Sequence, residues 1–154
     1  MSALPLVPMI WSFYLCSALL AVLLASCLWL KSVLLRGLLA LAAIAYLLVG
    51  IASVISFISV YYYQLPTHHC PFDLIQSGYN YIGYPLYLTL FGAVFCALVP
   101  FLLSTLERFG SLGKVLSGRE RRWLVAALLF LLGLLLIVSW PLVIGPFTMK
   151  PFMV

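Results

Sequence analysis

Residues 123–145 read WLVAALLFLLGLLLIVSWPLVIG, a run without a single charged side chain. At about 1.5 Å of rise per residue, a helix of this length matches the roughly 30 Å hydrocarbon core of a bilayer. Trp123 and Trp140 stand at or near its ends. Indole rings favour the headgroup boundary, where the ring is half buried and the N–H meets water. The stretch therefore predicts a transmembrane helix.

Three further apolar runs cover residues 6–30, 33–62 and 84–105. Each reaches the roughly 20 residues that a helix needs to cross a bilayer. The second run is longer than one crossing requires, so we expect it to tilt or to project past the membrane. We predict an all-α integral membrane protein, a single domain over residues 1–154, with four transmembrane helices arranged as two antiparallel hairpins.

The composition supports this class. Of the 154 residues, 66% are hydrophobic and 7% are charged, and the mean hydropathy is +1.25. Soluble domains average about 45–50% apolar and about 25% charged residues. The net charge is +5, and the charged residues are few and lie in short segments beside the apolar runs. This distribution excludes a disordered chain and a nucleic-acid-binding protein. The expected partner is therefore the lipid bilayer.

Basic residues predict the orientation. They gather in the segments 31–36 and 106–122, which join the first helix to the second and the third to the fourth. Seven of the eight lie there, namely Lys31, Arg36, Arg108, Lys114, Arg119, Arg121 and Arg122, and Lys150 falls in the C-terminal tail. Short loops rich in Lys and Arg stay in the cytoplasm. We therefore expect both termini and the loop 63–83 on the non-cytoplasmic side. The short loops, without an evident sorting signal, favour a bacterial cytoplasmic (inner) membrane.

A cleaved N-terminal signal is the alternative for the first run. Residues 24–27 read LASC, which is similar to the lipobox of bacterial lipoproteins. Residues 1–10, however, contain no Lys or Arg for the basic region of a signal peptide. Cleavage at Cys27 would also reverse the orientation and export both basic loops. We expect a permanent helix.

Potential ligands for a metal ion cluster in the exterior loop. His68, His69, Cys70 and Asp73 fall within six residues, in a chain with two histidines and three acidic residues. Imidazole and thiolate are preferred donors for zinc and copper. In extended backbone, the side chains of His68 and Cys70 point the same way and can share one ion. These four residues are the predicted metal site, with copper, zinc or haem as the candidate cofactor.

Two alternatives remain for this cluster. The chain has neither C-x-x-C nor H-x-x-x-H, so a closed structural zinc site is not indicated, and ordinary polar loop chemistry at the headgroup boundary would also explain the residues. Thiol redox chemistry is the other alternative. Cys70 is the only thiol expected in the exterior loop, which leaves it without an intrachain partner for a disulfide.

Tyrosines surround the same loop. The candidate pocket residues are Tyr63, Tyr79, Tyr81, Tyr84 and Tyr87. Aromatic rings with a polar tip suit a quinone or a lipid headgroup at the membrane surface. The alternative is an aromatic belt that anchors the second and third helices.

The centres of the predicted spans contain no Asp, Glu, Lys, Arg or His. This excludes the usual proton-driven transporter, and it disfavours a haem held between two helices by histidines. Gly50, Ser53, Ser56 and Ser59 recur every three residues, a pattern that favours close helix packing.

Two functions are consistent with these features. The first is a small membrane protein that binds or transfers a transition metal, haem or electrons at its extracytoplasmic His-His-Cys loop. The second is a non-catalytic scaffold or regulatory subunit of a larger membrane complex, with other membrane subunits or further copies of itself as partners. The sequence leaves enzymatic activity open, with a non-catalytic role favoured.

Overall fold

The computed structural model describes residues 6–30, 32–65, 70–106 and 113–144, and every regular element within these ranges is helical. The long helices are α1 (Leu6–Trp29), α2 (Val33–Ser53), α4 (Gly83–Leu106) and α5 (Gly113–Ile144). Helix α2 continues through the π-helix η1 (Val54–Ile58) into α3 (Ser59–Tyr63). Two 3₁₀ turns, η2 (Asp73–Ile75) and η3 (Ser77–Tyr79), precede α4.

Four helical segments are long and apolar enough to cross a membrane. They are Leu6–Trp29, Val33–Tyr63, Gly83–Thr105 and Arg119–Ile144. The prediction of four helices that are long and apolar enough to span a membrane is therefore confirmed for the described residues. The helices also extend into the predicted cytoplasmic loops 31–36 and 106–122, because α2 begins at Val33 and α5 at Gly113.

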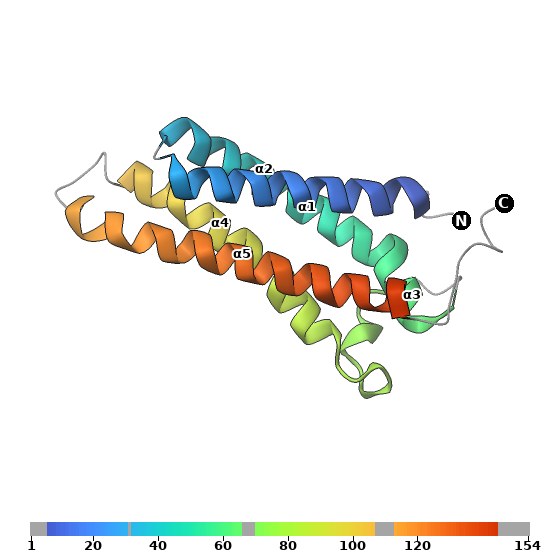
Figure 1. The fold of residues 1–154 in the computed structure, drawn as a ribbon. Coiled ribbons are helices and arrows are strands. Elements are labelled where there is room, and N and C mark those ends of the chain that lie inside the picture. Colours follow the sequence, from blue (N-terminus) through green and yellow to red (C-terminus); the bar gives the residue numbers. More distant parts are fainter. Residues whose placement is uncertain (1–5, 31, 66–69, 107–112, 145–154) are drawn as a thin grey trace.

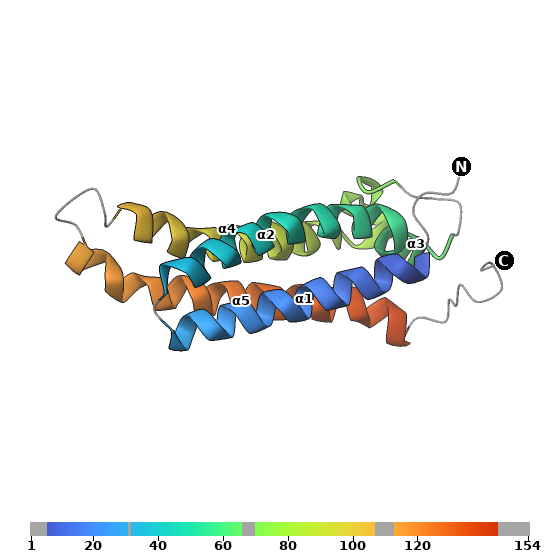
Figure 2. The same ribbon diagram turned by 90° about the horizontal axis from the view of Figure 1, so that it is seen from above.

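The long helices pack as one bundle of two layers (Figure 2), with α2 and α4 in one layer and α1 and α5 in the other. Helix α4 packs against α5 and α2, and α1 packs against α2 and α5. The start of α1, the end of α3 and the end of α5 lie at one end of the bundle (Figure 1). We call this the tyrosine end, defined by residues 59–65 and 70–87. The opposite end, defined by Arg36 and residues 119–122, is the arginine end.

Small residues set the helix spacing. A Cβ atom at Gly50 would lie 2.7 Å from a methyl carbon of Leu90 on α4, and one at Gly92 would lie 3.0 Å from the ring of Phe130 on α5. Gly50 is buried, as are Ser53, Ser56 and Ser59 of the predicted packing stripe. This close approach maximises dispersion contacts, which drive helix association where no water is expelled.

The outer surface of the bundle is apolar. Its most exposed large side chains include Leu15, Leu19, Val22, Leu34, Leu41, Leu48, Leu88, Leu129 and Leu136. Trp11, Trp29 and Trp140 are also exposed, whereas Trp123 packs edge-on against Phe95 with ring centroids 6.0 Å apart. Aliphatic groups on the outside and small polar groups inside are what a bilayer solvent requires.

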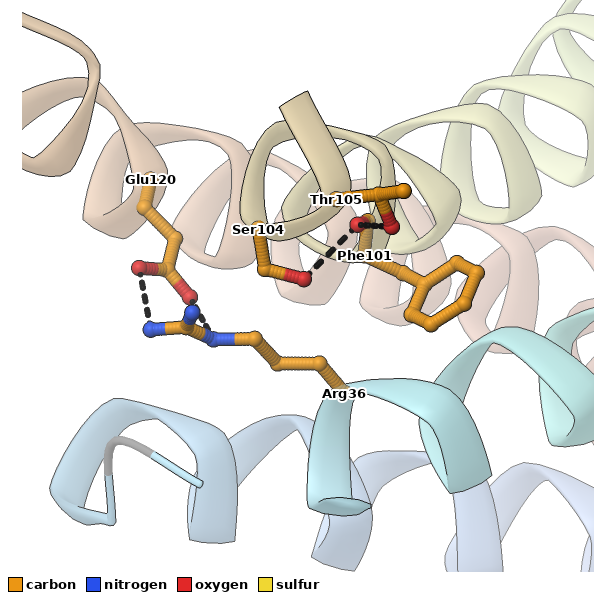
Figure 3. A network of polar contacts seen from close by, with 5 residues as sticks. All are labelled: Arg36, Phe101, Ser104, Thr105 and Glu120. Carbon is orange, nitrogen blue, oxygen red and sulfur yellow. Dashed lines mark hydrogen bonds and ion pairs between the residues drawn. The ribbon is translucent and has the colours of Figure 1, made fainter. Parts of the chain in front are cut away.

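An ion pair ties two helices together at the arginine end (Figure 3). Arg36 Nε lies 2.6 Å from Glu120 Oε1, and Arg36 Nη2 donates to Glu120 Oε2 at 2.8 Å. Arg36 is only 8% exposed, although the sequence placed it in a loop. Glu120 of α5 neutralises the Arg36 charge, and this allows a buried arginine in the first turn of α2. Bidentate geometry of this kind fixes the register of the two helices.

Tyr62 links the far ends of α3 and α5. Its hydroxyl donates to the Ile137 carbonyl at 2.6 Å. Pro141 lies inside α5 and has no N–H, so it cannot donate to the carbonyl of Ile137 four residues earlier. Tyr62 supplies the missing donor from a neighbouring helix, which is how proline is accommodated within membrane helices.

Candidate functional site at the tyrosine end

The predicted metal ligands are only partly described. His68 and His69 lie outside the described residues, while Cys70 and Asp73 lie within them. Cys70 is half-buried, and its thiol forms no disulfide with the other three cysteines, all of which are described. Among the described residues, no group of three or more His, Cys, Asp and Glu side chains gathers as a metal site. The predicted donor set, which includes both histidines, stays a prediction.

Two tyrosines hold the backbone at Cys70. The Tyr63 hydroxyl, from α3, donates to the Cys70 carbonyl. The Tyr87 hydroxyl, from α4, donates to the Pro71 carbonyl at 2.7 Å. Consecutive carbonyls are thus bonded to two different helices. We call this pair of contacts the tyrosine clamp. It fixes the position of the Cys70 backbone relative to the bundle.

Asp73 begins the 3₁₀ turn η2. Its Oδ1 atom accepts a hydrogen bond of 3.0 Å from the side-chain amide of Gln76. Leu74, the next residue, is completely buried and anchors the turn in the hydrophobic core. The Asp73 carboxylate therefore belongs to a short structured segment, and Leu74 attaches this segment to the bundle.

Gly83 lets this segment lie against the start of α4. A Cβ atom at Gly83 would lie 2.9 Å from the backbone carbonyl carbon of Leu74 and 3.0 Å from the backbone nitrogen of Ile75. Because these are backbone atoms, they cannot move aside as a flexible side chain would. Gly83 thus provides the close approach that holds residues 70–79 against α4.

The five candidate pocket tyrosines fall into separate places. Tyr63 and Tyr79 are in contact, with ring centroids 4.5 Å apart. Tyr81 and Tyr84 pair with each other at 6.2 Å and are exposed. Tyr87 belongs to the tyrosine clamp. The structure therefore brings Tyr63 and Tyr79 together. It places Tyr81 and Tyr84 on the surface.

A cavity of about 570 Å³ opens beside Tyr79. Its walls come from η3 and the following turn, α3 and α5, and they comprise Tyr62, Gly78, Tyr79, Asn80, Ile82, Leu136, Ile137 and Trp140. We call it the α5 cavity. Of these lining residues, only Tyr79 was predicted from the sequence as a pocket residue. The proline at 141 was a usable signal, because the carbonyl it orphans needs a donor from another helix.

A second cavity, of about 340 Å³, lies on the α2 and α4 side. It is lined by Ile51, Val54, Ile55, Pro71, Phe72, Ile75, Tyr87 and Phe91. Two lining residues, Val54 and Ile55, belong to the π-helix η1. A π-turn carries one extra residue per turn, which bulges the backbone locally. Almost all of this lining is hydrocarbon, so the cavity suits an acyl chain and offers little recognition of a polar group.

The turn between η3 and α4 is strained. Asn80 and Tyr81 have φ values of 52° and 55°, in the left-handed region. Asparagine tolerates this region, but a bulky residue such as tyrosine rarely adopts it. Strain of this kind persists where surrounding structure enforces it, frequently at ligand sites.

Comparison with known proteins gives no match. No family model, no curated protein and no solved structure is significantly similar to this chain. Function must therefore be argued from the residues and the geometry alone.

Proposed function

We propose that this chain is a membrane protein that binds or transfers a transition metal, haem or electrons at an extracytoplasmic loop, through His68, His69 and Cys70, with Asp73 as a further donor. The observation that carries the proposal is the tyrosine clamp. Holding the backbone at the donor thiol lowers the entropy that would be lost when a ligand binds there. Polar contacts that orient ligating residues commonly affect metal affinity by about 10–100-fold.

The chemistry of the donors supports copper or zinc. Neutral imidazole and thiolate bind both ions, whereas magnesium and calcium prefer oxygen. A set of two to four donors at a loop suits a labile ion that is passed on, or a site completed by a partner. Haem remains within the proposal, since His and Cys are also axial ligands of haem iron.

In the proposed topology, the donors lie on the extracytoplasmic side of the membrane. The described arginines, Arg36, Arg119, Arg121 and Arg122, lie at the arginine end, opposite the donor loop. Basic residues stay in the cytoplasm, so we propose that the tyrosine end and both termini are exterior, with the helices forming two antiparallel hairpins. A bacterial inner membrane is the proposed location.

Metal content tests the proposal. Protein purified without a polyhistidine tag is expected to contain, or to take up, about one copper or zinc ion or one haem per chain, as measured by elemental analysis and absorbance. The double variant His68→Ala/Cys70→Ala should lose this content. Tyr63→Phe, which keeps all donors and releases the Cys70 carbonyl, should weaken metal affinity about tenfold.

The control is Cys16→Ala, which removes a partly buried thiol of α1 far from the donor loop in sequence. It should leave the metal content unchanged. Wild-type protein that stays free of metal and haem after incubation with copper, zinc and haem would contradict the proposal. The second candidate, a non-catalytic scaffold or regulatory subunit, would then be favoured if stoichiometric partner subunits were recovered in mild detergent.

A further inference from the structure

The α5 cavity is lined both by the exposed outer surface of α5 and by the turn that follows η3. Trp140 and Leu136, which line it from α5, are 65% and 73% exposed on the outer surface of the bundle. Gly78 and Asn80, on the opposite wall, belong to the exposed turn beyond the helices. The cavity therefore connects the hydrocarbon layer with the aqueous boundary, so a molecule dissolved in the bilayer can enter it from the side.

The polar groups of the cavity are neutral. The groups free to donate come from the Asn80 amide, the Tyr79 hydroxyl and the Trp140 indole N–H, because the Tyr62 hydroxyl already donates to the Ile137 carbonyl. Among the residues that the structure describes, no charged side chain lines the cavity, and the arginines lie at the other end of the bundle. A lipid phosphate buried without a cation is strongly disfavoured. Amide, phenol and indole donors instead suit a neutral molecule with carbonyl acceptors.

Shape points to a flat ring with an apolar tail. Trp140, Tyr62 and Tyr79 supply aromatic surfaces, while Leu136 and Ile82 continue the wall as hydrocarbon. The volume of about 570 Å³ lies within the usual range of roughly 300–1,000 Å³ for small-molecule sites. Asn80, which lines the cavity, has a left-handed backbone conformation, and strain of this kind is frequent at ligand sites.

We propose that the α5 cavity binds the ring of an isoprenoid quinone taken from the bilayer, with its carbonyl oxygens accepting hydrogen bonds from the neutral donors and its tail leaving past Leu136. This inference does not depend on a metal at the donor loop. The cavity is nevertheless linked to that loop, because Tyr79 of its wall contacts Tyr63 of the tyrosine clamp.

A blocking substitution is available that the fold should accept. A Cβ atom at Gly78 meets nothing within 4 Å, and Gly78 does not have a positive φ. Gly78→Leu therefore adds bulk at the cavity wall without a backbone clash. Ser77→Leu is the matched control, because Ser77 is an exposed neighbour in η3 that does not line the cavity.

Binding can be followed through Trp140. With Trp11, Trp29 and Trp123 replaced by Phe, Trp140 is the one remaining tryptophan of the chain. In phosphatidylcholine nanodiscs, decylubiquinone should quench its fluorescence saturably, above the linear collisional background. Gly78→Leu should weaken this binding at least tenfold, and Ser77→Leu should not. Asn80→Gly removes the amide while tolerating the left-handed backbone, and it should weaken binding severalfold without loss of thermal stability.

Purely linear quenching would overturn the proposal, as would equal affinities for the wild type and Gly78→Leu. Displacement of decylubiquinone by phosphatidylglycerol at equal concentration would also overturn it, since the site would then recognise lipid headgroups. Metal content measured on the same samples keeps the two proposals separate. Protein that contains metal but does not bind quinone would contradict the quinone proposal alone. Protein that binds quinone but contains no metal or haem would contradict the metal proposal alone.

Discussion

Replacing Glu120 with alanine should destabilise the folded protein by about 3–5 kcal/mol, the usual cost of removing one partner from a buried ion pair. Arg36 would retain its charge in a site where it is almost completely buried. The α2 and α5 helices would also lose the two contacts that fix their relative position. Thermal unfolding in detergent, followed by the reaction of the buried Cys27 and Cys96 thiols with a maleimide dye, measures the loss.

The double variant Arg36→Met/Glu120→Leu separates the charge from the packing. It removes both charges and keeps similar volumes, so it should recover most of the stability that Glu120→Ala loses. Arg121→Ala changes an exposed arginine one position away and should alter stability by less than about 0.5 kcal/mol. Equal effects of Glu120→Ala and Arg121→Ala would show that the buried pair contributes nothing.

Tyr62→Phe should cost about 1–2 kcal/mol, because it leaves the Ile137 carbonyl without its donor inside the membrane. The structural reason is Pro141, which has no N–H to give. In a Pro141→Ala background, the new N–H of residue 141 can donate to Ile137, and Tyr62→Phe should then become nearly neutral. The free energies of unfolding of the wild type, the two single variants and the double variant form a double-mutant cycle. This cycle measures the coupling between Tyr62 and Pro141.

Tyr14→Phe is the matched control for the cycle. The Tyr14 hydroxyl is hydrogen-bonded to Ser139 of the same helix α5 at 2.9 Å, but neither group replaces a missing backbone donor. Its cost should be about 0.6 kcal/mol, typical of such bonds in membranes, and independent of Pro141→Ala. A cost of Tyr62→Phe that is unchanged by Pro141→Ala would refute the explanation.

The membrane-spanning helices were predictable because apolar length is a direct consequence of the bilayer. The run 123–145 and the other three stretches of hydrophobic residues correspond to four helices of the structure. Three helices begin within one residue of the predicted runs, whereas α5 begins at Gly113, ten residues before its run. Arg36 marked a loop by its charge, but a partner 84 residues away along the chain neutralises it within α2. Contacts between distant residues of this kind leave no mark in local hydropathy.

The clustering of tyrosines at the tyrosine end was predictable from the sequence. The contacts that each tyrosine makes were not. Clustering of Tyr63, Tyr79 and Tyr87 near one loop is visible in the sequence, yet their individual roles depend on where α3, α4 and α5 meet. Tyr63 and Tyr87 hold successive carbonyls, while Tyr79 lines the α5 cavity. The left-handed conformation of Tyr81 is imposed by tertiary structure against local preference, so no propensity predicts it.

The proposed function depends most directly on the side of the membrane on which the donor loop lies. In a variant without the native cysteines, Ser77→Cys places a single thiol on the exposed turn at the tyrosine end, and Leu30→Cys places one after α1 at the arginine end. An impermeant maleimide applied to intact bacteria expressing the protein should label residue 77 and reach residue 30 only after permeabilisation. The reverse pattern would contradict the account, because the proposed metal ligands would then face the cytoplasm.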